Sequence, residues 1–195
     1  RYPLCGRGDI NTYAVFAELG NGVIGAAGAF GMVIPSGIAT DDTTKHFFGD
    51  LVASARLRSV YTFANQERLF RGVDSRVCFT LLTIAAPKPV GLEMDFVWFA
   101  TSAKDLLDQD RHYRLSPADL QRLNPNTGTC PIFRSARDAG INRAVYARVP
   151  VLVREGPPEE NPWGISFLRM LDMANDSGLF RTAEQLEAEG WVLAG

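Results

Sequence analysis

The sequence lacks the features that most often identify a metal site or a disulfide-rich protein. Its 195 residues hold three cysteines and two histidines. No Cys-x-x-Cys pair occurs and His46 lies far from His112, so we expect no zinc or other metal site. An odd number of widely spaced cysteines also favours the reducing cytoplasm over a secreted disulfide framework.

Long apolar runs are missing as well. No run approaches the ~20 residues that a helix needs to cross a bilayer, so we expect no membrane contact. Arg1-Tyr2-Pro3-Leu4 does not resemble the start of a signal peptide. Because the first residue is Arg and not Met, we expect the chain to be a piece of a longer protein.

Motifs of a self-contained active site are also absent. A nuclease of the PD-(D/E)xK type needs an acid two positions before a lysine. The residues at those positions are Thr43, Ala86 and Ser102. Ser36 lacks the Gly-x-Ser-x-Gly elbow of hydrolases, and the adjacent Asp41 and Asp42 are more typical of a helix cap than of an acid/base pair. We therefore predict no catalytic residue within this chain.

Residues 1–86 do show the alternation of helices and strands that is typical of an α/β protein. Asp9 is the expected N-cap of a helix over 11–18, which Gly20-Asn21-Gly22 would end. Thr40-Asp41-Asp42 is expected to cap a second helix. The apolar stripe of that second helix is Phe47, Phe48, Leu51 and Val52.

Strands are expected between and after these helices. The apolar run 30–34, stopped by Pro35, is typical of a buried parallel strand. The ranges 57–63, 77–84 and 94–99 predict further strands, and 77–84 should be central because it is apolar almost without a break. These elements make half of an α/β sheet, so the sheet needs partners that the chain does not supply.

From about Ala100 onward the sequence predicts short helices joined by loops. Ser116, Ser135 and Thr182 are the expected N-caps of three of these helices. The segment 154–162, which is polar and rich in Gly and Pro, is the best candidate for a linker.

Several segments within residues 6–84 resemble N6-adenine DNA methyltransferases. Residues 8–18 are similar to the helix that follows the catalytic motif in that family, and 28–36 resemble its next strand. Residues 69–73, leading into 77–82, look like the family's late aromatic motif and final hairpin. These segments follow the family's order and approximate spacing.

Later segments resemble the large fused restriction-methylase enzymes and their phage-defence relatives. These segments are residues 36–41, 123–127, 161–165 and 173–178. The resemblance covers nearly the whole chain, and for residues 1–100 it implies a partial Rossmann-like methyltransferase sheet, the last three strands with flanking helices. A mostly helical connector toward a target-recognition region would follow in 101–195.

The resemblance also implies the activity of the parent protein. Such an enzyme transfers methyl from S-adenosyl-L-methionine (SAM) to adenine N6 in double-stranded DNA, within a restriction–modification system. The family's glycine-rich SAM turn and Asn/Asp-Pro-Pro-aromatic motif do not occur here: Asn161-Pro162-Trp163 lacks the second Pro, and Asn124-Pro125-Asn126 has no aromatic. We therefore expect the missing N-terminal half of the domain to be the chain's partner, and the isolated chain to be inactive and without cofactor.

Three aromatic residues take roles from this resemblance. An enzyme that modifies a base within duplex DNA flips the base out and stacks it on an aromatic surface. In the family that the chain resembles, the aromatic residue just before the final hairpin stacks on the flipped adenine, and Phe70 occupies this position. The alternative is that Phe70 is a hydrophobe closing a strand turn. Tyr13 and Phe16 match the helix that lines the pocket for the adenine ring of SAM, and the alternative for them is core packing.

Arginine supplies most of the positive charge, since lysine occurs only at 45, 88 and 104 and the net charge is −2. Residues 130–154 nevertheless hold five arginines against Asp138 alone, a local charge of +4. The candidate DNA-phosphate contacts are Arg134, Arg137, Arg143, Arg148 and Arg154. The alternative is a solvated helix whose charges pair with acids such as Glu159 and Glu160.

Two other functions are compatible with the same patterns. One is a non-catalytic nucleic-acid or protein binding module of a defence complex. The other is a different α/β transferase that shares only the arrangement of the sheet.

Overall fold

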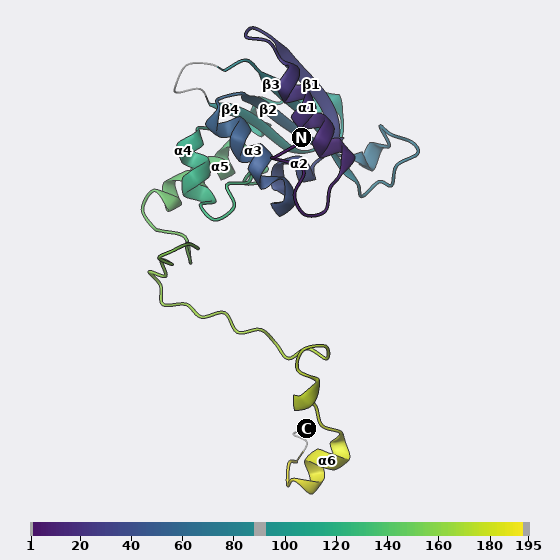
Figure 1. Cartoon of the computed structure of the whole chain (residues 1–195), viewed down its shortest axis with the longest axis vertical. Helices are drawn as coiled ribbons and strands as arrows, with labels where there is room; N and C mark the ends of the chain where they lie inside the picture. Colours follow the sequence, from purple (N-terminus) through teal and green to yellow (C-terminus); the bar gives the residue numbers. More distant parts are fainter. Residues whose placement is uncertain (1, 88–92, 193–195) are drawn as a thin grey trace. The chain divides into compact units, whose positions relative to one another are not determined.

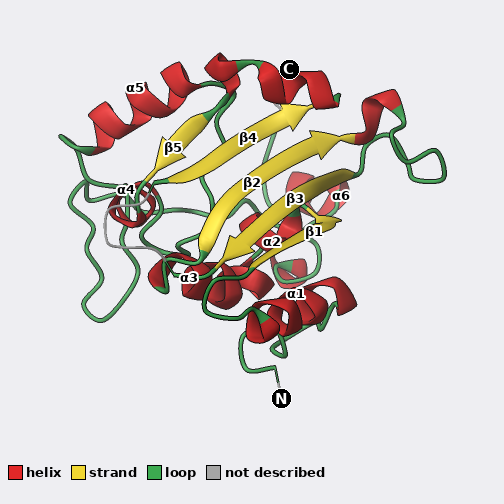
Figure 2. Ribbon diagram, turned by 90° about the horizontal axis from the view of Figure 1, so that it is seen from above, coloured by secondary structure: helices red, strands yellow, loops and turns green. Residues whose placement is uncertain are grey.

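The chain folds around a five-stranded sheet, described by a computed structural model for residues 2–87 and 93–192 (Figures 1 and 2). Its strands are β1 (Ala29–Pro35), β2 (Leu57–Ala64), β3 (Cys78–Ala85), β4 (Met94–Ala100) and β5 (Tyr113–Leu115). They lie in the order β1-β3-β2-β4-β5. β3 is antiparallel to both β1 and β2, β4 is parallel to β2, and β5 is antiparallel to β4. β1, β2 and β4 therefore run in the same direction.

Most of the strand predictions are confirmed. β2, β3 and β4 cover the ranges predicted from the apolar runs, and β3 has a neighbour on each side, as expected for a central strand. The resemblance implied a sheet of three strands, but β4 and β5 belong to the same sheet as β1, β2 and β3.

β1 is not the buried parallel strand that its apolar run predicted. It pairs antiparallel with β3, and its side chains alternate between exposed and partly or fully buried. Phe30, Met32 and Ile34 face the core, whereas Val33 between them is 53% exposed. A strand with one packed face shows this alternation. The apolar run therefore reflects one buried face and not two.

Helices precede, connect and follow the strands. The α-helices are α1 (Thr12–Val23), α2 (Gly37–Thr40), α3 (Lys45–Ala53), α4 (Pro117–Leu123), α5 (Ala136–Tyr146) and α6 (Ala183–Ala188). Short 3-10 helices are η1 (Asp42–Thr44), η2 (Asn65–Glu67), η3 (Ala103–Leu107), η4 (Gln109–Arg111) and η5 (Ser177–Leu179). Buried side chains of α1 to α5 form one core with side chains of the sheet. In Figure 2, α1, α2 and α3 lie together on one side of the strands and α5 lies beside β5.

The main core lies between these helices and the sheet. Its largest fully buried side chains include Phe47 of α3, Phe96 of β4 and Tyr113 of β5. On the opposite face of the sheet, Phe63 and Val97 anchor a second, smaller cluster. The two faces of the sheet are thus packed unequally.

α1 begins and ends later than expected. Its N-cap is Asn11 and not Asp9, and the helix continues through Gly20-Asn21-Gly22. Gly20 does not end the helix because it meets the sheet there: a Cβ at Gly20 would lie 2.4 Å from the ring of Phe30. The glycine is required for close approach and not for a turn.

The segment before α3 forms α2 and η1 in place of a simple side-chain cap. Neither Asp41 nor Thr44, which precede η1 and α3, caps its helix with its side chain. Asp42 instead forms an ion pair with Lys45, with 2.7 Å between Oδ1 and Nζ. The predicted apolar stripe is confirmed, since the buried side chains of α3 are Phe47, Phe48 and Leu51.

The three later caps are confirmed. Ser116 and Asp119 form a reciprocal capping box at α4, as do Thr182 and Gln185 at α6. The Ser135 side chain accepts a hydrogen bond from the backbone N–H three positions on, at the start of α5.

The contacts divide the chain into two units, Arg1–Pro162 and Trp163–Gly195, and the predicted linker 154–162 ends at this division. The functional boundary predicted at residue 100 stays a prediction. It does not coincide with the division between the two units, because the first unit contains β4 before this residue and β5, α4 and α5 after it. The second unit contains η5 and α6. No helix in the described part of the chain is both long and apolar enough to span a bilayer.

Candidate nucleic-acid interface

One edge of the sheet collects the C-terminal ends of β1, β2 and β4, because these strands share a direction. In open α/β sheets, ligands bind outside this edge. Two segments rise from it: the loop 65–77 after β2 and the segment 101–112 after β4. They contact each other, since Thr101 Oγ1 donates to Glu67 Oε1 at 3.3 Å. This edge is therefore the candidate site.

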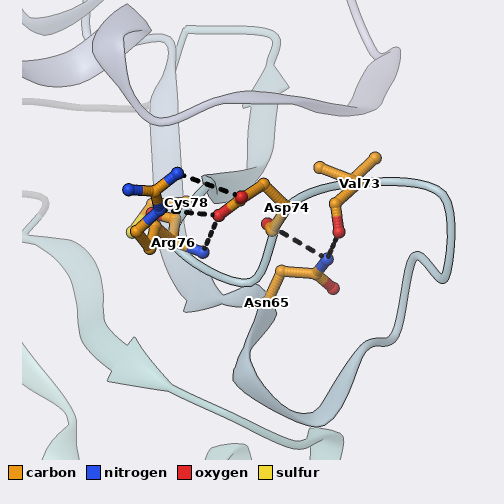
Figure 3. Close-up of polar contacts among 5 residues, drawn as sticks. All are labelled: Asn65, Val73, Asp74, Arg76 and Cys78. Carbon is orange, nitrogen blue, oxygen red and sulfur yellow. Dashed lines mark hydrogen bonds and ion pairs between the residues drawn. The ribbon is translucent and has the colours of Figure 1, made fainter.

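The loop 65–77 is held from inside by Asn65, which is fully buried (Figure 3). Asn65 Nδ2 donates to the carbonyl oxygens of Phe70 and Val73, each at 2.9 Å. Its Oδ1 accepts from the N–H of Phe70 at 2.9 Å. At the end of the loop, Asp74 Oδ1 accepts from the backbone N–H and the Nε of Arg76, both at 2.9 Å. The loop backbone is thus fixed by side chains at both ends.

Phe70 stands on this fixed loop with one side packed and the other open. Its ring meets Phe79 edge-on, with 4.8 Å between centroids and 88° between planes. Phe79 in turn stacks on Phe63, at 5.2 Å and 3°. Phe70 is 44% exposed. The ring is therefore supported from the sheet and available to a second planar group.

Tyr13 and Phe16 share α1 but differ in surroundings. Tyr13 is half-buried against the core, and burial, followed by the charge of Asp41, raises the pKa of its hydroxyl. Phe16 is 59% exposed, so it is not a core side chain. It lines an apolar groove of about 470 Å³ between α1 and β1, together with residues that include Phe30 and Met32.

Two of the candidate arginines pair with acids of the chain, although all five are exposed. Arg143 Nε lies 3.2 Å from Oδ1 of the buried Asp119. Burial opposes ionisation of Asp119, but hydrogen bonds from Ser116 and the charge of Arg143 outweigh it and lower the pKa of this carboxyl. Arg154 pairs with Glu160 at 3.7 Å. Glu160 is one of the two acids that the alternative interpretation named as partners of these arginines.

The other three arginines are exposed: Arg134, Arg137 and Arg148. Arg134 lies over the ring of Phe99, with 4.6 Å from Cζ to the ring centroid. Because Phe99 is the penultimate residue of β4, Arg134 is brought to the same sheet edge as the loop 65–77.

A polar cluster lies on the opposite face of the sheet from the helices. Tyr61 Oη donates to Asp95 Oδ2 at 2.7 Å, and His112 Nδ1 lies 2.8 Å from the same oxygen. His112 Nε2 lies 3.0 Å from the carbonyl oxygen of Leu106. Burial, followed by the hydrogen bond to Asp95, raises the pKa of Tyr61 to about 12. These bonds tie η3 to the sheet, and His112 serves that internal contact.

Neither Asn-Pro segment lies where a catalytic tetrapeptide is expected. Asn124 ends α4, and its Nδ2 donates to Thr129 Oγ1 at 2.9 Å. Asn161, Pro162 and Trp163 lie in a turn outside the named strands. Within residues 2–87 and 93–192, no group of His, Cys, Asp or Glu side chains could hold a metal ion.

The sequence predicted a base-stacking role for Phe70, which lies in the loop 65–77 at this edge, but gave no role to the residues that support it. Asn65, Phe79 and Phe99 were not singled out. An asparagine directly after a strand and before a long loop is the signal that could have indicated Asn65. No family model matches the chain, and no curated protein matches it.

Proposed function

We propose that this chain is the C-terminal part of a SAM-dependent N6-adenine DNA methyltransferase of the fused restriction-methylase type. The observation that carries the proposal is Phe70, an exposed aromatic ring on a fixed loop at the edge of the sheet where ligands bind in open α/β proteins. Its sequence position is that of the base-stacking aromatic in the resemblance. The five-stranded α/β sheet is compatible with a Rossmann-like fold.

In this function, Phe70 receives the adenine that leaves the DNA stack. A flipped base loses its stacking with neighbouring bases and regains part of it on an aromatic side chain. Phe79 and Asn65 keep the ring in place, so little conformational entropy is lost when the base arrives. The Asn/Asp-Pro-Pro-aromatic motif that accepts hydrogen bonds from the adenine amino group would come from the missing N-terminal half.

SAM would supply the methyl group, and the groove beside Phe16 fits only part of this cofactor. The groove is lined by apolar and aromatic side chains and by glycine, which suits the face of an adenine ring. Hydrogen bonds to the ribose and the methionine portion must then come from the N-terminal half. The edge of β1 that does not face β3 is the place where its strands would continue the sheet.

The direct test measures base flipping in the enzyme restored with its N-terminal half. We expect Phe70→Ala to weaken flipping, read from 2-aminopurine fluorescence at the target position, by about ten- to a hundredfold, since base–aromatic stacking is worth roughly 1–3 kcal/mol. SAM affinity should stay nearly unchanged. Phe70→Tyr keeps a stacking ring and should retain flipping.

Phe180→Ala is the matched control, because Phe180 is also partly exposed (39%) and lies in the second unit. If Phe70→Ala lowers SAM affinity and thermal stability as much as flipping, Phe70 only closes a strand turn and its assigned role is wrong.

A non-catalytic binding module is the second candidate. It is favoured by the way helices α1 to α5 and the sheet share one core within the first unit. The two candidates differ in whether restoring the upstream segment creates a SAM site.

A further inference from the structure

The C-terminal end of β4 carries a second exposed aromatic ring, which no sequence pattern had indicated. Phe99 is 41% exposed and has φ +60°, the left-handed region that bulky residues rarely adopt. Its carbonyl oxygen accepts from Arg111 Nη1 at 3.4 Å. Just beyond it, Asp105 Oδ2 accepts from the N–H of Thr101 at 2.7 Å and from that of Ser102 at 3.0 Å. The backbone is thus held in a conformation that turns Phe99 outward.

Phe99 borders a pocket of about 320 Å³. Among its lining residues are Asp108, Asp110, Arg111 and Arg134. The guanidinium of Arg134 lies over the Phe99 ring, with 4.6 Å from Cζ to the ring centroid. Unlike Arg143 and Arg154, Arg134 forms no ion pair with an acid of the described residues. The pocket therefore offers an aromatic ring with a planar cation lying over it.

The charges of this pocket favour a nucleobase over a phosphate. Arg111 is already paired with Asp108, with 3.6 Å between Nε and Oδ2. Asp110 adds a second carboxylate, so two acids balance two arginines around the cavity. A phosphate would be repelled by the carboxylates. A base instead stacks on Phe99 or Arg134 and can donate its amino hydrogens to a carboxylate.

The pocket lies beside the loop of Phe70. Phe63 at the end of β2 pairs with Ala100 at the end of β4, and Thr101 donates to Glu67 of the neighbouring segment. One exposed aromatic residue, Phe70, thus lies in the loop after β2, and another, Phe99, lies near the end of the adjacent parallel strand β4.

We propose that Phe99 and Arg134 form a second base-stacking site, which binds an unpaired nucleobase beside the base held by Phe70. This inference rests on the proposed function and extends it to a second nucleotide. It also gives Arg134 a role different from that of a phosphate contact.

The experiment uses the full chain and a single-stranded deoxyoligonucleotide that contains 2-aminopurine. Binding is followed by fluorescence anisotropy and by quenching of the 2-aminopurine on stacking. Phe99→Leu keeps the apolar volume without the aromatic face, and Arg134→Lys keeps the charge without the plane. Each is expected to raise Kd about tenfold and to reduce the quenching. Phe99→Tyr should bind within about twofold of the unaltered chain, because the stacking surface is kept.

The matched controls both lie in the second unit: Phe180→Leu changes a partly exposed aromatic residue, and Arg169→Lys changes an exposed arginine. Both should leave Kd and quenching unchanged. Absence of binding by the unaltered chain overturns the inference, as does an unaltered Kd in both Phe99→Leu and Arg134→Lys. If Arg134→Ala weakens binding but Arg134→Lys does not, Arg134 contacts phosphate and the base site is wrong.

Phe70→Leu separates this inference from the proposed function. If it weakens binding while Phe99→Leu does not, the second site fails and the proposed role of Phe70 stands. If only Phe99→Leu weakens binding, the pocket stands and the role of Phe70 fails.

Discussion

A single carboxamide organises the loop that presents Phe70. Asn65→Asp would replace the Nδ2 donor by an oxygen that faces the carbonyl oxygens of Phe70 and Val73. We expect it to lower the free energy of unfolding by about 2–4 kcal/mol, since buried polar groups would be left without partners. Urea unfolding measures the loss, and hydrogen exchange should increase first in residues 66–77.

Asn126→Asp is the control for this change, because Asn126 is exposed and its Nδ2 donates to Val153 O at 3.0 Å. It should cost less than about 1 kcal/mol. Equal losses in the two variants would contradict the role given to Asn65.

Buried thiols make the stability fall at alkaline pH. Burial raises the pKa of Cys130 from 9.0 to about 12, so the folded chain holds a proton that the unfolded chain releases. The stabilisation is complete below pH 9 and is lost as pH rises toward 12. Cys5 and Tyr61, whose pKa values are each raised to about 12, act in the same direction.

We expect Cys130→Ala to show a smaller drop in the urea midpoint between about pH 8 and about pH 11 than the unaltered chain. Cys78→Ala, a change at a half-exposed cysteine, should keep the full drop. The interpretation fails if the two variants respond alike.

At the residue scale, local features were predictable and long-range pairs were not, and the stacking role of Phe70 stays a prediction. Phe70 could be found from the order of motifs along the chain. The pairing of Arg143 with Asp119 could not, because it depends on how α5 packs beside α4. The contact of Arg134 with the Phe99 ring could not be predicted either, because Phe99 lies in β4, far earlier in the sequence.

Among the helices, α1 contains two glycines with opposite consequences. A Cβ at Gly20 would lie 2.4 Å from the Phe30 ring, whereas one at Gly22 has nothing within 4 Å. We expect Gly22→Ala to stabilise the chain by about 0.5–1 kcal/mol through helix propensity. Gly20→Ala should destabilise it by about 1–2 kcal/mol, because overpacking outweighs the same gain. Thermal melting of both variants is the measurement, and stabilisation by both would show that Phe30 yields freely.

The capping boxes and the interior strand were predictable because their signals are local. Ser116 and Thr182 each form a box with a residue three positions on, and β3 is recognisable from a run that is apolar almost without a break. The antiparallel pairing of β1 was not, since a run of apolar residues does not reveal whether one face or both will be covered. The predicted end of α1 was also wrong because of a contact that the sequence does not show: Gly20 packs against Phe30 of the sheet and does not end the helix.

For the whole molecule, we expect the isolated chain neither to bind SAM measurably nor to methylate DNA. It has no glycine-rich cofactor turn and no Asn/Asp-Pro-Pro-aromatic motif, and its groove beside Phe16 offers one apolar wall. Isothermal titration calorimetry of residues 1–195 is the measurement. Micromolar affinity for SAM would contradict the picture of a half-built domain, and a SAM site that appears only with the upstream segment would exclude the binding-module alternative.

The place of β3 between β1 and β2 sets a constraint on synthesis. In the described structure β1 and β2 pair with β3 and not with each other, and Ala29 meets Ala85. A nascent chain emerging from the ribosome therefore carries two apolar strands with open hydrogen-bonding edges until Ala85 has left the exit tunnel. Such edges recruit strands of other chains. The interval in which β1 and β2 wait for β3 is thus a period in which strands of other chains can pair with this polypeptide.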